Sequence, residues 1–188
     1  MTATAVGTVD APVDPSIMRQ AMGQFASGVT VITTLDGEGN PTGCTMSAFS
    51  SLSLDPPLVL VCIGKDRSMA KWLQEGNGYV VNILAAHQAD LALNFAGRAP
   101  NRFSEVSWQP GLHGMPRLDG VICHVECDLS SIADGGDHLI VIGAVAGAEV
   151  HDGDPLLYAQ GKFGQMLQAK PSDGPASLPD EWLCSAPW

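Results

Sequence analysis

The chain has 188 residues, 45% of them hydrophobic, and its 9 basic and 20 acidic side chains give a formal net charge of -11. This size and composition fit one domain with a sizeable core. The acidic balance argues against nucleic acid and against an anionic membrane surface, because both partners need a basic protein surface. It leaves room for one phosphorylated ligand, which backbone N–H groups and hydroxyls can hold.

No apolar run is long enough to span a bilayer, and residues 1–14 lack the basic start and apolar stretch of a signal peptide. We therefore expect a cytoplasmic protein with disordered residues 1–14, one domain over residues 15–168 and a flexible tail over residues 169–188. The cysteines form no CxxC pair and are expected to be free, mostly as small buried hydrophobes. They are Cys44, Cys62, Cys123, Cys127 and Cys184.

The first predicted elements are a helix and a hairpin. Ser16 is expected to cap a helix that runs to about Ala26. Residues 28–34 are rich in β-branched side chains, which is typical of a strand, and residues 36–41 are expected to form a turn. The second strand of this hairpin is then expected within residues 45–57, TMSAFSSLSLDPP.

The middle of the chain alternates strands with short helices. Residues 58–63 are apolar at every position, which predicts a strand buried on both faces. Ser68 is expected to cap a short helix that ends at Gly76. Residues 78–84 predict a further strand, and a helix follows over about residues 86–95.

The last third of the chain is strand-rich after a loop-rich region over residues 98–120. Two long strands are expected over residues 121–129 and 139–150, separated by a loop over residues 133–138, and a last strand begins at Pro155. Six or more strands with a few short helices predict a mainly β fold that forms a barrel.

One face of residues 45–57 is unusually rich in hydroxyl groups. Side chains of a strand alternate between its two faces, so Thr45, Ser47 and Ser51 would share one row. The scarce basic pair Lys65 and Arg67 follows closely, next to a helix start, and this combination is typical of a phosphate pocket. On the residues alone, a ligand pocket and a plain solvated surface are equally supported.

Other site motifs are weak. The glycines of residues 37–43 approach a dinucleotide fingerprint, but their spacing is one residue too long and they lead into a strand, so we interpret them as a turn. His124 and Glu126 alternate in direction with Cys123 and Cys127, so these four cannot converge on a metal, and no metal site is expected. No nucleophile motif is present. His138 remains a candidate, because it follows a glycine-rich loop before a long strand.

Several segments, taken in order, resemble the short-chain flavin reductase family, the reductase partners of two-component flavin-dependent monooxygenases. The resemblance covers about residues 17–167. Its segments are residues 21–34, 43–61, 79–84, 94–97, 136–143 and 155–163. Cys44 departs from the family, in which Met or a similar residue is more common at that position.

The resemblance implies an FMN-binding split β-barrel, Greek-key-like, with a few short helices and usually homodimeric. It implies reduction of FMN or FAD by NADH or NADPH and release of the reduced flavin to a partner monooxygenase. NADH is favoured over NADPH, because no basic cluster flanks His138. The alternatives are a split-barrel flavin oxidase that acts on an organic substrate and a non-catalytic flavin- or haem-binding protein.

The resemblance also implies the cofactor-binding residues, while no side chain is expected to act as an essential catalytic acid or base. Those that would line the flavin are Thr45, Met46, Ser47, Ala48, Phe49, Ser51 and Leu52. Asp66, Arg67 and Ser68 would meet its phosphate end. His138 and Tyr158 would contact the nicotinamide nucleotide.

Overall fold

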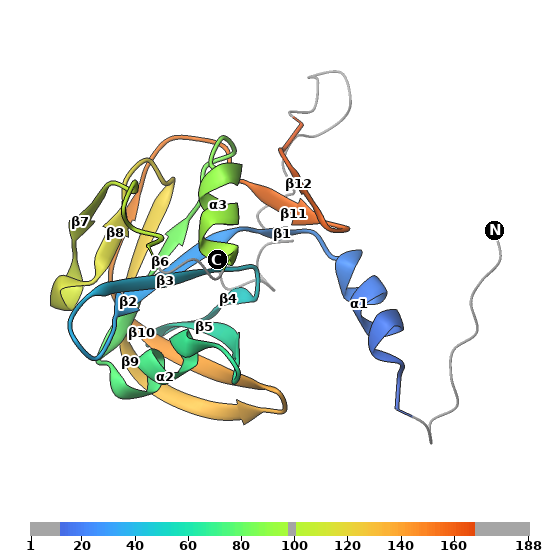
Figure 1. Cartoon of the computed structure of the whole chain (residues 1–188), viewed down its shortest axis with the longest axis horizontal. Helices are drawn as coiled ribbons and strands as arrows, with labels where there is room; N and C mark the ends of the chain where they lie inside the picture. Colours follow the sequence, from blue (N-terminus) through green and yellow to red (C-terminus); the bar gives the residue numbers. More distant parts are fainter. Residues whose placement is uncertain (1–11, 98–100, 168–188) are drawn as a thin grey trace.

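The structure is a computed structural model that describes residues 12–97 and 101–167. Its main feature, within these ranges, is one antiparallel sheet with the strand order β3-β2-β6-β9-β10-β5-β4 (Figure 1). The strands are β2 (Thr30–Leu35), β3 (Pro41–Met46), β4 (Phe49–Leu54), β5 (Pro57–Gly64), β6 (Gly78–Ile83), β9 (Cys123–Gly135) and β10 (His138–Val150). The mainly β fold predicted from the sequence is confirmed.

Short strands and helices surround this sheet. A small sheet has the order β1-β11-β12, and β7 pairs with β8. These strands are β1 (Ser27–Gly28), β7 (Trp108–Pro110), β8 (Pro116–Leu118), β11 (Leu157–Ala159) and β12 (Lys162–Gly164). The helices are α1 (Pro15–Gly23), α2 (Ser68–Glu75), α3 (Ala89–Ala96) and the single turn η1 (Leu112–Gly114). No helix in the described part of the chain is both long and apolar enough to cross a membrane.

The two outermost strands of the main sheet, β3 and β4, are consecutive in sequence but lie at opposite edges. The single strand predicted over residues 45–57 is therefore wrong. Strand β3 pairs with β2 as far as Met46, whose carbonyl accepts a hydrogen bond from Thr30 Oγ1 at 2.8 Å. Two residues later the chain pairs with β5 instead, since the Ala48 carbonyl accepts the backbone N–H of Cys62 at 3.0 Å. We call this link, Ser47 and Ala48, the seam. At the seam the two edge strands β3 and β4 are joined by the peptide chain alone and do not pair with each other, as in a split barrel.

The core lies between the sheet and the helices that cover it. One cluster gathers under α2 around Ile32, Val61, Leu73 and Tyr79, all of which are almost fully buried. A second cluster surrounds Phe95 of α3. These clusters fix the positions of both helices against the sheet.

Strand β5 is buried on one face, whereas the sequence predicted burial on both. Val59, Val61 and Ile63 point into the core, and the alternate row, which includes Leu60 and Cys62, is half-buried. That row lines a cavity described below. From sequence alone, apolar side chains that line a cavity cannot be distinguished from apolar side chains that pack in a core.

Two helix caps differ from their predictions. Asp14, not Ser16, caps α1, because Asp14 Oδ1 accepts the Ser16 N–H at 2.7 Å. Ser68 is the first residue of α2 and makes no capping bond. Helix α1 buries none of its side chains and projects away from the main sheet (Figure 1).

The loop predicted over residues 133–138 is shorter in the structure. The β9–β10 hairpin turns at Gly136 and Asp137 only, and His138 already belongs to β10. Gly136 has a φ of +79°, which glycine adopts without steric cost. The expectations for residues 1–11 and 169–188, including Cys184, lie outside the described residues.

Candidate functional site

A cavity of about 570 Å³ lies beside the seam, between β3, the end of β5, the start of α2 and the start of β10. It brings together most of the residues that the sequence singled out. These are Thr45, Met46, Ser47, Ala48, Asp66, Arg67, Ser68 and His138. We call it the seam cavity. Residues separated by more than 90 positions in sequence therefore share one concave surface, because β10 pairs with β5 and brings His138 opposite Gly64.

Gly64 ends β5 opposite His138 and lies close to the side chain of Asp66. A Cβ on Gly64 would lie 2.8 Å from Asp66 Oδ1 and 3.8 Å from His138 Nε2. The first distance is closer than carbon–oxygen contact permits, so a side chain here would push the exposed Asp66 carboxylate aside. The turn after Gly64 is tied to the β9–β10 hairpin, since the Lys65 N–H donates to the Asp137 carbonyl at 3.0 Å and Lys65 Nζ pairs with Asp134.

The ring of His138 is oriented by its neighbour. His138 Nδ1 lies 2.7 Å from Asp137 Oδ1, and the carboxylate accepts this hydrogen bond. The same hydrogen bond, with the positive charge of the ring when it is protonated, holds the pKa of Asp137 below its ordinary value. Nδ1 is therefore the proton-bearing nitrogen, and Nε2 of the neutral ring can accept a hydrogen bond.

Sequence reasoning missed Arg102, which also lines the seam cavity. Its Nη1 donates to the Gly43 carbonyl at 2.7 Å, while its buried Nε has no hydrogen-bond partner among the described residues. A buried guanidinium donor without a partner is costly, and a bound anion would satisfy it. The only signal in the sequence is an arginine in a cation-poor chain, and it lies in a region where no element was predicted.

Two guanidinium groups thus face a cavity in an acidic protein. Burial raises the pKa of the Cys44 thiol to about 11, and the positive charges of Arg102 and Arg67 oppose that rise. The thiol is therefore protonated at neutral pH and adds no negative charge to the cavity. The pair Arg67 and Arg102, with the Ser68 hydroxyl, suits a phosphate group.

The hydroxyl of Thr45 is already engaged. Thr45 Oγ1 donates to the Ala92 carbonyl at 2.5 Å and so ties β3 to α3. The hydroxyls of residues 45–53 consequently do not form one ligand-facing row, because the seam separates Thr45 on β3 from Ser51 on β4. Ser51 and Leu52 line neither this cavity nor the one described next.

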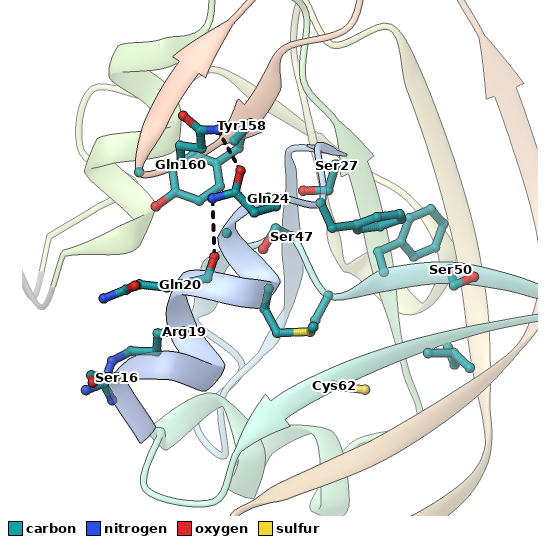
Figure 2. Close-up of a pocket in the computed structure, with 18 residues that line it drawn as sticks. Ser16, Arg19, Gln20, Gln24, Ser27, Ser47, Ser50, Cys62, Tyr158 and Gln160 are labelled. Atoms are coloured by element: carbon teal, nitrogen blue, oxygen red, sulfur yellow. Dashed lines mark hydrogen bonds between the residues drawn. The ribbon is translucent and has the colours of Figure 1, made fainter. Parts of the chain in front are cut away.

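A second cavity of about 1220 Å³, which we call the α1 cavity, contains Phe49 and Tyr158. Figure 2 shows α1 on one side of it, with Tyr158 and Gln160 above the helix and Cys62 on the strand opposite. Ser47, Ala48 and Cys62 line both cavities, so the two meet at the seam. Within one chain, Tyr158 and His138 therefore lie in different cavities, and the structure does not bring them together.

Comparison with known proteins identifies the class to which this site belongs. The model of the flavin reductase like domain matches residues 22–167. The chain is 38% identical over 152 residues to "Flavin-dependent monooxygenase, reductase subunit HsaB" of Rhodococcus jostii (strain RHA1), covering 80% of this chain and 77% of that protein. It is 41% identical over 167 residues to "NADH-dependent flavin reductase" of Rhodococcus sp, covering 87% and 92% of the two chains.

A solved structure extends the likeness to the whole fold. It is the Streptomyces globisporus C-1027 NADH:FAD oxidoreductase SgcE6 in complex with NAD and FAD fragments. The TM-score is 0.80 at 34% sequence identity, over 89% of this chain and all of the other. The chain therefore belongs to the flavin reductase family, and the split barrel implied by the sequence resemblance is confirmed.

Proposed function

We propose that the protein is an NADH-dependent flavin reductase that reduces FMN or FAD and releases the product to a partner flavin-dependent monooxygenase. The observation that carries this proposal is the convergence of the seam, Arg67, Ser68, Arg102 and His138 on one cavity. The relatives named as NADH-dependent flavin reductase and as a monooxygenase reductase subunit support the same reaction and the same kind of partner.

The residues of the seam cavity divide by chemistry into two ends. Arg67, Ser68 and Arg102 offer charged and neutral hydrogen-bond donors suited to the flavin phosphate. At the seam, Ser47 and Ala48 are small, so a flat ring system can approach the backbone there. When bound, the flavin supplies the acceptor for the hydride of the nicotinamide.

The protein's part in this reaction is to position the reactants and to exclude water. We assign the nicotinamide nucleotide to the β10 end of the cavity, where Asp137 orients the His138 ring. No side chain of the cavity has to donate or remove a proton for the transfer itself.

The free cysteines among the described residues suit a reducing compartment, so the cytoplasm is the proposed location.

We further propose that the protein works as a homodimer in which α1 covers a second copy. The α1 segment exposes apolar side chains that the chain itself leaves uncovered: Ile17, Met18 and Met22 are 49–57% exposed and Phe25 is 79% exposed. Met22 and Phe25 line the α1 cavity, so a second copy would also close the cavity that holds Tyr158.

The first test is NADH consumption by the purified protein with added FMN, with added FAD, or with neither. The proposal expects turnover that depends on added flavin, and the better flavin identifies the physiological product. Tight flavin binding without NADH oxidation would contradict it and would favour an oxidase of an organic substrate or a carrier.

A variant tests the phosphate end of the cavity. Arg102→Met should weaken flavin binding by roughly ten- to a hundredfold, because a charge-assisted hydrogen bond contributes about 1.5–3 kcal/mol. Flavin affinity is measured by quenching of flavin fluorescence. Arg19→Met, which removes a cation from the α1 cavity, is the matched control and should leave the affinity unchanged. Equal affinities for the Arg102→Met protein and the unmodified chain would remove Arg102 from the site.

A further inference from the structure

A second group of polar side chains lies at the open end of the β9–β10 hairpin, far from the seam cavity. His124 of β9 and Glu149 of β10 are direct cross-strand partners, and His151 follows two residues after Glu149. The backbone N–H of His151 donates to the Ile122 carbonyl at 2.8 Å, which holds this segment beside β9. One donor atom from each of His124, Glu149 and His151 lies within 4.8 Å of the other two.

The orientation of His124 suits a metal ligand. Its Nε2 lies 2.9 Å from the Leu118 carbonyl, which can only accept a hydrogen bond, so Nε2 bears the proton. The lone pair is therefore on Nδ1. A backbone carbonyl that fixes the ring through the other nitrogen is the usual outer contact of a metal-binding histidine. The side chain is 6% exposed, so the ring is held in place before any ion binds.

A cation already contacts these donors. Arg117 Nη2 pairs with Glu149 Oε2 and lies 3.4 Å from His124 Nδ1, so the guanidinium bridges two of the three groups. Its buried Nε has no hydrogen-bond partner among the described residues, and Nη1 lies 3.6 Å from Glu126 Oε1. The hydrogen-bonding capacity of the guanidinium is therefore only partly used at its present position. A metal ion at His124 Nδ1 would displace Nη2 toward Glu126.

The surrounding charge favours a cation over an anion. The cluster opens into a cavity of about 610 Å³ that Asp119 and Asp152 also line. Together with Glu149, three carboxylate side chains therefore line the cavity, against the single guanidinium of Arg117. An anion would have to enter a region that is already negative, whereas a divalent cation would offset the excess.

We propose that His124, Glu149 and His151 form a binding site for a divalent transition metal ion, with Zn²⁺ as the best match. Two imidazole nitrogens and one carboxylate oxygen are a ligand set that Zn²⁺ prefers, and the cavity leaves the fourth position to water. The metal ion ties the start of β9 to the chain that follows β10, and the Leu118 carbonyl links β8 to the same site. His138 and the seam cavity lie at the other end of β10, so the role of the ion is to stabilise the hairpin.

The sequence predicted no metal site, because only Cys123, Glu126 and Cys127 were considered as ligands that could join His124. In the structure the cluster consists of His124, Glu149 and His151. The partners of His124 come instead from a strand 25 residues later, through the register that pairs Glu149 with His124.

The test is a titration of the full-length, tag-free protein with Co²⁺, followed by visible absorption, and with Zn²⁺, followed by thermal unfolding. We expect one equivalent of Co²⁺ to give a tetrahedral or five-coordinate spectrum and Zn²⁺ to raise Tm. His151→Ala and Glu149→Gln should each weaken binding by about tenfold or more, since even outer contacts of metal sites contribute 10–100-fold. Both positions are on the surface, so both variants should fold.

His113→Asn is the matched control, because His113 also pairs with a carboxylate, Asp128, at 2.7 Å but lies outside the cluster. Its φ of +53° is tolerated by asparagine, and its Co²⁺ affinity should equal that of the unmodified chain. Arg117→Gln should tighten Co²⁺ binding several-fold, because it removes the competing positive charge.

Three outcomes would overturn the proposal. The first is absence of stoichiometric Co²⁺ or Zn²⁺ binding by the unmodified protein. The second is binding that survives in His151→Ala and Glu149→Gln, which would place the ion elsewhere. The third is weaker binding in Arg117→Gln, which would show that the guanidinium supports the cluster rather than competing for it.

Discussion

Tyr79 carries a polar group that the fold does not use. The side chain is fully buried in the core under α2, and its hydroxyl has no hydrogen-bond partner among the described residues. Burial raises the pKa of this phenol well above its ordinary value, so the group is uncharged at neutral pH. An unsatisfied buried hydroxyl costs stability that a phenyl ring of the same shape would not.

We therefore expect Tyr79→Phe to raise the free energy of unfolding by about 1 kcal/mol, the desolvation cost of one buried hydroxyl. Urea unfolding measures it, and the slope with urea should stay constant, since the exposed surface hardly changes. A loss of stability would mean that the hydroxyl has a partner, such as a buried water.

His138 is expected to act on binding more than on chemistry. Loss of one hydrogen-bonding side chain removes about 0.5–1.5 kcal/mol, so His138→Ala should raise the apparent KM for NADH by roughly three- to tenfold. The value of kcat should change by less than about twofold, because no proton transfer depends on the ring. Steady-state kinetics at saturating flavin separates the two. A collapsed kcat with an unchanged KM would make His138 part of the chemical step.

The sequence could predict residues of the seam cavity whose environment is local, and it missed those whose role depends on distant strands. Arg67 and Ser68 adjoin a helix start that is visible as a pattern, and the family resemblance then placed them at a phosphate. Arg102 faces the cavity only because its segment packs through Phe103 against Phe95 and Trp108, with ring centroids 5.0 and 6.3 Å apart. No periodicity in the loop-rich region indicated that contact.

At the scale of the element, strand β10 requires a glycine at position 143 but not at position 147. A Cβ on Gly143 would lie 2.5 Å from Tyr79 Oη and 2.7 Å from Cys127 Cβ, whereas nothing lies within 4 Å of the corresponding atom on Gly147. The strand therefore passes directly over the core tyrosine at Gly143 and is open at Gly147.

Gly143→Ala should lower the free energy of unfolding by about 1–3 kcal/mol, the usual cost of overpacking a core. Gly147→Ala is the matched control in the same strand and should stay within about 0.5 kcal/mol of the unmodified protein. Adding Tyr79→Phe to Gly143→Ala should recover part of the loss, because it removes the closest atom. Equal effects of the two glycine substitutions in thermal or urea unfolding would contradict this packing.

Elements with a strong local pattern were predicted more reliably than their boundaries. The β-branched residues of β2 and the hydrophobic run of β6 identified both strands, since burial on both faces selects such residues. The seam was not predicted, because residues 45–54 keep the alternation of a strand on both sides of it. Residues before the seam pair with β2, and residues after it pair with β5. Which strand becomes the partner depends on the arrangement of the whole sheet, so the local sequence does not indicate it.

At the scale of the whole molecule, the proposed homodimer rests on the exposed apolar side chains Ile17, Met18, Met22 and Phe25. Met22→Glu should shift the protein from dimer to monomer, because a carboxylate cannot be buried at an apolar interface without a partner. Size-exclusion chromatography with light scattering measures the mass. Leu93→Glu, at a residue 59% exposed on α3, is the control and should remain dimeric. An unmodified chain that is already monomeric would remove the dimer proposal.

The position of the seam also has a kinetic consequence. The hairpins β2–β3, β4–β5 and β9–β10 each form from neighbouring residues, whereas the pairing of β5 with β10 joins residues 74 positions apart, from Gly64 to His138. Loop-closure entropy delays such distant pairings, so the two sides of the seam come together late in folding. Because the seam cavity forms only after these strands have paired, flavin has no site to bind earlier in folding and cannot accelerate it. Added flavin should therefore slow unfolding and leave the refolding rate unchanged, which stopped-flow measurements with and without flavin can decide.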